Sequence, residues 1–213
     1  MRDDSHDELT RVSSSLVTMA RAVRETMRQA SAALLGADHT LAQQVTDRDA
    51  EIEVLRRVVE DRVYDLVASR RPADGDLRMI MTALQVAADL ERMGDLAVHV
   101  VRAVLRRHPA PAVVPELVDL FRAMGAVADQ LAEKIVAALA GQDATLAAQL
   151  DGDDDAMDDL HRRLFTVMLS PDWPLGVEAA IDGALLGRYY ERYADHAVNV
   201  GRHVVFLVTG KTG

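Results

Sequence analysis

The sequence predicts an all-α protein built as a tandem repeat of two homologous three-helix bundles. Three observations carry this prediction. Apolar residues recur at helical spacing along most of the chain, and two segments of the first half return in the second half. Strand signals are weak, because aromatic residues make up only 4% of the 213 residues and no segment alternates apolar and polar side chains for long.

Six segments carry apolar residues at i, i+3, i+4 and i+7, the spacing of one buried helix face. The predicted helices are 9–35, 40–69, 77–107, 115–140, 145–169 and 176–208. Gly36 and Gly141 suit the left-handed residue that follows a helix, and Asp38 and Asp143 suit the N-caps of the helices that come next. The first and fourth predicted helices therefore end in the same way.

Proline supplies the other boundaries. Pro72 and Pro171 interrupt the chain after the second and fifth helices, and Asp76 is placed to cap the third. Residues 106–116, RRHPAPAVVPE, contain three prolines and predict a stiff linker between two groups of three helices. We therefore expect a first repeat over residues 1–108 and a second over residues 109–213.

The internal repeat is visible in two pairs of segments. LERMGDLAVHVVRAV, residues 90–104, and YERYADHAVNVGRHV, residues 190–204, agree at eight of fifteen positions. LLGADHTLAQQV, residues 34–45, and LAGQDATLAAQL, residues 139–150, agree at seven of twelve. The offset changes from 105 to 100 in the loop between the second and third helix of each unit, where insertions and deletions are tolerated.

Composition excludes several classes of protein. The net charge of −10, with no block of Lys or Arg, argues against a surface that binds nucleic acid. Cysteine is absent, so disulfides, thiolate metal sites and cysteine nucleophiles are excluded together. The acidic start of the chain is unlike a signal peptide, and no run approaches the ~20 apolar residues of a membrane span. We expect a soluble protein, and the absence of cysteine is compatible with a reducing cytoplasm.

Each unit carries two pairs of carboxylates four residues apart. They are Asp49/Glu53 and Glu91/Asp95 in the first unit, and Asp154/Asp158 and Glu191/Asp195 in the second. Like charges at this spacing repel by roughly 0.2–0.5 kcal/mol on an exposed helix, and by more where the face is buried. Glu91 falls on an unbroken heptad seam of its helix, with Asp95 beside it. If the second and third helices of a unit pack antiparallel, the four carboxylates converge on one seam.

Two kinds of cation would compensate such a cluster. Hard metal ions held by oxygen ligands are one: Mg²⁺, Mn²⁺ or Ca²⁺, or iron or zinc in a carboxylate-rich site. Arginine is the other, and four arginines repeat between the units: Arg92, Arg192, Arg102 and Arg202. No pair of histidines on one helix face repeats between the units, so the histidines do not suggest a metal site.

The residues also carry a family resemblance. RRPADGDLRMIMTALQVAADLERMGDLAVHV, residues 70–100, resembles the first-domain signature of the PhoU family of phosphate-uptake regulators, and YERYADHAVNVGRHVVFLVTGK, residues 190–211, resembles its closing helix. The resemblance covers nearly the whole chain. It departs at Arg71, where the family often has glutamine, and at SPDWPLGVEAAIDG, residues 170–183, which is not the usual approach to the last helix.

The resemblance implies a cytoplasmic adaptor without enzymatic activity, which reaches a membrane only through its partners. Such proteins restrain the ATPase-driven Pst phosphate transporter and help its sensor histidine kinase to repress the phosphate-starvation response. They bind metal ions at E(D)xxxD motifs and commonly form homodimers. By similarity the candidate ligands for Mg, Mn, Fe or Zn are Glu91, Asp95, Glu191, Asp195, Asp49, Glu53, Asp154 and Asp158, with the first four foremost.

Two alternatives stay open at this point. A carboxylate-bridged di-metal protein, either an oxidase or a ferritin-like store, also places acidic residues inside a helical bundle, but such sites use Glu-x-x-His motifs. No histidine of this chain has a glutamate three residues before it. A helical dimerisation module without metal is the second alternative. The sequence shows no nucleophile–base pair, no glycine-rich phosphate loop and no dinucleotide motif, which argues against an enzyme.

Overall fold

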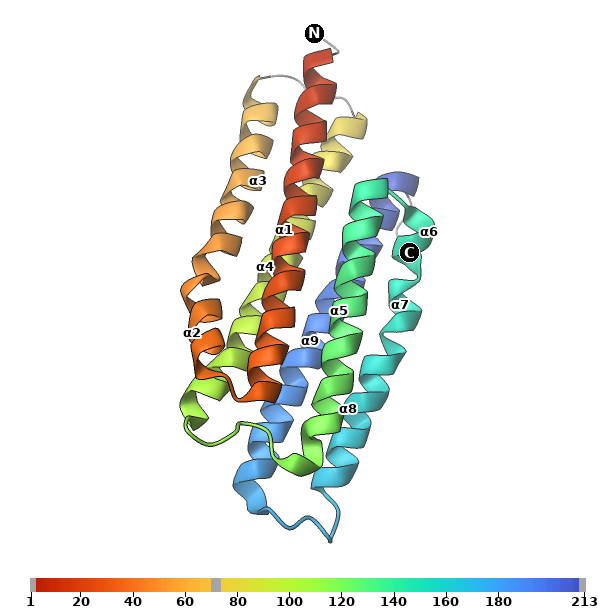
Figure 1. Cartoon of the computed structure of the whole chain (residues 1–213). Coiled ribbons are helices and arrows are strands. Elements are labelled where there is room, and N and C mark those ends of the chain that lie inside the picture. Colours follow the sequence, from red (N-terminus) through yellow and green to blue (C-terminus); the bar gives the residue numbers. More distant parts are fainter. Residues whose placement is uncertain (1–2, 70–73, 211–213) are drawn as a thin grey trace.

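The computed structural model describes residues 3–69 and 74–210, and its regular elements in these ranges are all helices, which confirms the all-α prediction (Figure 1). The first unit contains α1 (Asp3–Gly36), α2 (His39–Asp47), α3 (Asp49–Ser69) and α4 (Asp74–Arg107). The second unit contains α5 (Val118–Gly141), α6 (Ala144–Ala148), α7 (Leu150–Asp153), α8 (Asp155–Met168) and α9 (Gly176–Thr209), preceded by the 3₁₀ turn η1 (Pro115–Leu117).

The two units pack side by side along their length. The long helices α1, α4, α5 and α9 contact one another in the middle of the molecule, α2 and α3 lie against the first unit, and α6 to α8 lie against the second (Figure 1). The two units are antiparallel, so that equivalent ends of their helices lie at opposite ends of the molecule. The ends of α3 and α4 that the chain connects lie at the top of Figure 1, whereas the connection between α8 and α9 lies at the bottom.

The second helix of each unit is broken, so the predictions of continuous helices over 40–69 and 145–169 are wrong. In the first unit the break falls at Arg48, between α2 and α3, and in the second unit at Gln149 and Asp154. The local sequences, TDRD at residues 46–49 and DGDDD at 151–155, explain the breaks. Asp and Gly are poor helix formers, because Asp side chains compete for backbone hydrogen bonds and Gly loses the most backbone freedom when a helix forms.

The predicted N-caps are confirmed, but the left-handed residues are not the glycines. The Asp38 carboxylate accepts from the Leu41 amide at 3.0 Å, and Asp143 accepts from Thr145 and Leu146 at 2.9 Å. The left-handed positions are Ala37 and Gln142, each with φ of 49°. Gly36 and Gly141 are the last helical residues instead.

The hydrogen bonds of the turn decide this one-residue difference. After α1 the Asp38 amide donates to the Ala33 carbonyl at 2.9 Å, which closes a Schellman turn around Ala37. The Asp143 amide makes the same bond to Ala138 at 3.0 Å after α5. These bonds offset the modest cost of a left-handed non-glycine residue. Of the other predicted boundaries, Pro171 follows α8 as expected, and Pro72 is outside the described residues. The prediction that Asp76 caps the third helix is wrong, because α4 begins at Asp74 and Asp76 lies inside it.

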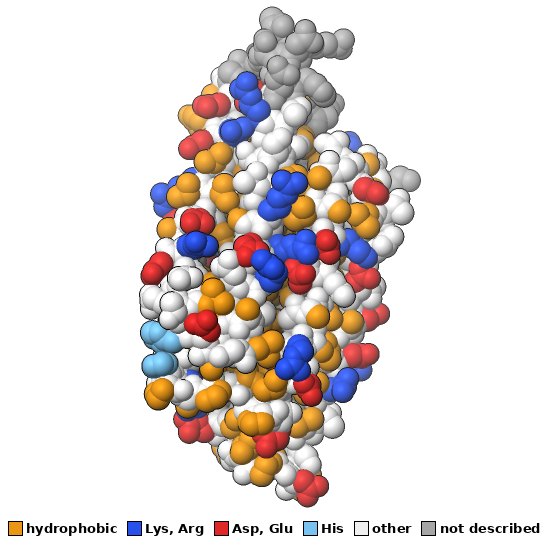
Figure 2. Space-filling model, in the orientation of Figure 1, with side chains coloured by type: hydrophobic (Ala, Val, Ile, Leu, Met, Phe, Trp, Pro, Cys, Tyr) orange, Lys and Arg blue, Asp and Glu red, His pale blue; other side chains and the backbone are white. Residues whose placement is uncertain are grey.

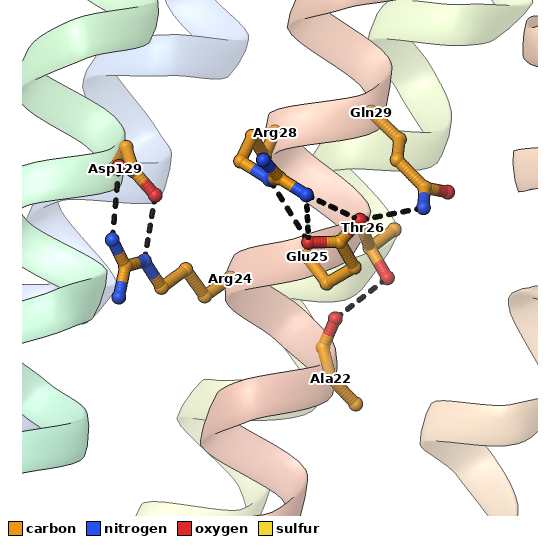
Figure 3. Close-up of polar contacts among 7 residues, drawn as sticks. All are labelled: Ala22, Arg24, Glu25, Thr26, Arg28, Gln29 and Asp129. Carbon is orange, nitrogen blue, oxygen red and sulfur yellow. Dashed lines mark hydrogen bonds and ion pairs between the residues drawn. The ribbon is translucent and has the colours of Figure 1, made fainter.

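One hydrophobic core runs through both units. Tyr190 of α9 is fully buried, its hydroxyl lies 2.8 Å from that of Ser31 in α1, and its ring lies against Phe121 of α5. At the surface of the same contact, Arg24 of α1 donates to both oxygens of Asp129 in α5, at 2.7 and 3.1 Å (Figure 3). Apolar packing and a two-pronged ion pair therefore hold the two repeats together.

The face of the molecule drawn in Figure 2 carries charges of both signs. On the face shown in Figure 2, acidic and basic side chains lie beside one another across the middle of the molecule. Within the described ranges no helix is both long enough and apolar enough to cross a membrane.

Candidate metal centre

The four predicted carboxylates of the second unit lie on two helices that pack against each other. Asp154 lies at the junction of α7 and α8, Asp158 lies one turn further along α8, and Glu191 and Asp195 lie on α9, which packs against α8. Burial, together with the smaller effect of the negative charges of Asp158, Asp195 and Glu191, raises the pKa of Asp154 to about 6. The four acids therefore act on one another across the two helices.

These acids have little internal compensation. Arg188 donates to both oxygens of Glu191 at 2.6 Å from its exposed position one turn away on α9. The side chains of Asp154, Asp158 and Asp195 make no hydrogen bond or ion pair within the part of the chain that the structure describes. Such a cluster attracts cations.

The first unit neutralises its carboxylates with arginine. Arg56 of α3 donates to the half-buried Glu91 of α4 at 2.5 Å and also binds Glu60. Arg57 forms an ion pair with the exposed Glu53. Arg92 binds Asp95 at 2.9 Å, while the side chain of Asp49 is outside the described residues. Of the repeated arginines, Arg92 reaches the candidate ligand Asp95, whereas Arg202 pairs with Asp151, which is not a candidate ligand.

One position explains why no arginine crosses between the two helices in the second unit. At the offset of 105, Arg56 corresponds to His161 and Glu60 corresponds to Phe165. His161 packs against Gly187 of α9, and its Nε2 atom is buried without a hydrogen-bond partner among the described residues. The second unit thus lacks the cation that crosses from α3 to α4 in the first. The replacement of Arg56 by His161 is visible in the repeat, but arginines that recur in both units do not reveal it.

The oxygen donors of the second unit are of the chemical type that hard cations prefer. Carboxylate oxygens are the ligands that Mg²⁺, Mn²⁺ and Ca²⁺ prefer, and iron and zinc also accept them. Within the described ranges, no three Asp, Glu or His side chains lie close enough to surround one ion. Coordination therefore requires the side chains of Asp154, Asp158, Glu191 and Asp195 to turn toward one another.

The pKa of Asp154 leads to a pH-dependent stability. The folded protein binds this proton more tightly than the unfolded chain, whose carboxyl has the ordinary pKa of 3.8. Stability contributed by the protonated form is present below pH 4 and is lost as the pH rises through about 6. We expect Asp154→Asn to raise the melting temperature at pH 8 in the presence of a chelator, with the gain disappearing near pH 4.

The exposed Asp159 on the same helix, which pairs with Arg162, provides the matched control. Asp159→Asn removes the same charge outside the cluster and should not raise the melting temperature at pH 8. Thermal unfolding followed by circular dichroism between pH 4 and pH 8 measures both variants. Parallel curves for wild type and Asp154→Asn over this range would contradict the assignment.

Comparison with known proteins places this arrangement in a family. Residues 16–104 and 121–204 each match the model of the PhoU domain, which agrees with the tandem repeat. The chain is 44% identical to the phosphate-specific transport system accessory protein PhoU homolog 2 of Mycobacterium tuberculosis, over 99% of each chain. It is 42% identical to PhoU homolog 1 of the same organism, over 99% of this chain and 95% of that one.

Solved structures agree with the fold. The crystal structure of PhoU from Pseudomonas aeruginosa superimposes with a TM-score of 0.87 at 30% identity, covering 97% of this chain and 99% of that one. The phosphate transport system regulatory protein PhoU from Streptococcus pneumoniae gives a TM-score of 0.87 at 23% identity, over 98% and 99% of the two chains. At that lower identity the likeness concerns the fold alone.

Proposed function

Because this chain belongs to the PhoU family, we propose that it is a cytoplasmic regulator of phosphate uptake and of phosphate-starvation signalling. In this proposal it restrains the Pst phosphate transporter through its ATPase, and it helps the phosphate-sensing histidine kinase to repress the starvation response. The observation that carries the proposal is the full-length similarity to proteins named as accessory proteins of the phosphate-specific transport system. The protein acts by binding its partners, and homodimer formation is part of the proposal.

A metal ion at the second unit is the second part of this proposal. Asp154, Asp158, Glu191 and Asp195 would hold it, and its charge would offset the repulsion among them and link α8 to α9. Magnesium, manganese, iron and zinc all suit such ligands. The first-unit residues Glu53, Glu91 and Asp95 are weaker candidates than the sequence suggested, because arginines already neutralise them.

Deleting the gene tests the proposed regulation. We expect the deletion strain to express phosphate-starvation genes in phosphate-rich medium, or to take up phosphate at an altered rate, because the restraint on transporter and kinase is lost. A reporter fusion to a starvation promoter and uptake of radiolabelled phosphate measure the two effects. The wild-type gene supplied in trans should reverse them. Unchanged expression and uptake, in a strain that holds no second copy of the gene, would contradict the proposal.

A further inference from the structure

An exposed apolar surface lies at the end of the second unit where α8 runs into α9. We call it the tip surface, and it consists of Phe165, Leu169, Val177, Ile181 and Leu185. Leu169 is 77% exposed, Val177 74% and Ile181 53%. Single apolar residues are ordinary on protein surfaces, but several on neighbouring turns of two packed helices indicate a binding site.

The tip surface continues into the acidic cluster. On α8 the series Asp154, Asp158, His161, Phe165 and Leu169 advances by three or four residues at each step, so it lies along one helix face. On α9 the corresponding series is Asp195, Glu191, Arg188, Ala184, Ile181 and Val177. Both faces therefore change from acidic to apolar along their length.

Packing between the helices aligns the two series. A Cβ placed on Gly187 would lie 3.2 Å from Cδ2 of His161, and one on Gly183 would lie 2.6 Å from the sulfur of Met168. Because α8 and α9 are antiparallel, the same register brings Asp158 and Asp154 toward Glu191 and Asp195 at the other end. The acidic ends of α8 and α9 thus coincide, and so do their apolar ends.

The first unit has the apolar end of this surface without the free acids. Tyr64, Leu77 and Met81 are exposed at its own tip, and by the two offsets they correspond to Leu169, Val177 and Ile181. The described carboxylates beyond them are paired with Arg56, Arg57 and Arg92. The positions of Phe165 and Leu185 are occupied by the polar residues Glu60 and Gln85.

We propose that the tip surface and the acidic cluster of the second unit together bind one helix of a partner protein. The partner helix presents apolar side chains on successive turns and then Lys or Arg on the next turns of the same face. Burial of the apolar side chains supplies the driving force. The basic residues meet Asp154, Asp158 and Asp195, which have no partner within the described chain, so the partner helix and the proposed metal ion compete for these acids. From Val177 to Asp195 the surface is about 27 Å long, which five turns of helix cover.

A lipid surface fits these observations less well. Peripheral membrane helices place Lys and Arg beside their apolar residues, whereas this surface continues into four carboxylates. The net charge of −10 also opposes approach to an anionic membrane. Only the identity of the partner as phosphate-transport or signalling machinery rests on the proposed function.

A designed peptide tests the binding directly. The probe is a fluorescein-labelled helical peptide of about 18 residues, with leucines on one face of its first half and lysines on the same face of its second half. Fluorescence anisotropy is recorded at physiological salt with a chelator present. We expect Val177→Ser/Ile181→Ser to raise the Kd at least tenfold, because two exposed apolar contacts are lost. Exposed positions tolerate this change, and circular dichroism verifies the fold of each variant.

The chain offers a matched control. Leu77→Ser/Met81→Ser makes the same change at the corresponding positions of the first unit and should leave the Kd within about twofold of wild type. A peptide of the same composition in scrambled order should bind at least tenfold more weakly. Equal Kd values for wild type and Val177→Ser/Ile181→Ser, or equal binding of the two peptides, would overturn the proposal. Sedimentation of the wild type, but not of the variant, with phosphatidylglycerol vesicles in the absence of peptide binding would assign the surface to a membrane instead.

The deletion strain separates this inference from the proposed function. If deletion induces starvation genes, Val177→Ser/Ile181→Ser at wild-type protein level should fail to restore repression, and Leu77→Ser/Met81→Ser should restore it. Full restoration by both variants would show that the second-unit surface does not bind the regulatory partner. If deletion has no effect, the proposed function fails, and the peptide measurement still decides whether the surface binds a helix.

Discussion

Replacing Glu191 and Asp195 with Gln and Asn should abolish the stabilisation of this protein by metal, whereas the same replacement of Glu91 and Asp95 should leave it in place. A ligand that binds only the folded state stabilises it by mass action, by about 2.7 kcal/mol at a hundredfold excess over Kd. For a domain of this size that is a rise of roughly 5–10 °C in melting temperature. Only the second pair belongs to a cluster without a crossing arginine.

The two double variants are matched, because they change corresponding residues of the repeat and preserve side-chain shape. Without metal, the second-unit variant should melt at or slightly above the wild-type temperature, since repulsion at i, i+4 is relieved. The first-unit variant should melt lower, because Arg56 loses its partner Glu91. Elemental analysis of the purified proteins and thermal melts with metal or chelator measure both effects.

Either of two results would be decisive against this assignment. Equal metal content in all three proteins, with melting temperatures insensitive to chelator, would remove the metal proposal. Loss of metal in the first-unit variant alone would place the ion beside Glu91 and Asp95, where the sequence also predicted ligands. The proposed role in phosphate regulation survives both outcomes, because it rests on full-length similarity.

Tyr190→Ala should be strongly destabilising, by about 3–5 kcal/mol, as for other large aromatic residues removed from a core. The side chain is fully buried at the contact between the units, beside Ser31 and Phe121. Its loss should lower the melting temperature by roughly 6–20 °C. Tyr190→Phe keeps the ring and removes only the hydroxyl that pairs with Ser31, so a loss of about 1 kcal/mol is expected.

Tyr64 provides the control for this prediction. It is 73% exposed, so Tyr64→Ala should change stability by no more than about 0.5 kcal/mol. Scanning calorimetry should also show one transition for the wild type, because the core around Tyr190 is shared by both units. Similar melting temperatures for Tyr64→Ala and Tyr190→Ala would contradict the importance assigned to this contact.

Local features of the sequence were sufficient for the fold class, the tandem repeat and the family. Helical periodicity, the N-caps Asp38 and Asp143 and the segments shared between residues 90–104 and 190–204 each depend on residues close together in the chain. The left-handed residues after the first and fourth predicted helices were misplaced by one residue, since the positions of Ala37 and Gln142 depend on which carbonyls the turn closes on.

Only the tertiary structure determined which cation, if any, lies beside each of the predicted carboxylates. Whether Glu91 meets a metal or an arginine depends on how α3 is rotated and aligned against α4, which in turn depends on contacts such as Ile52 against Gly94. Arg56 reaches Glu91 from 35 residues away. In the second unit His161 takes the place of Arg56, and the corresponding acids stay without a crossing cation. Periodicity places a side chain on a helix face, but the packing of two faces determines which side chains meet.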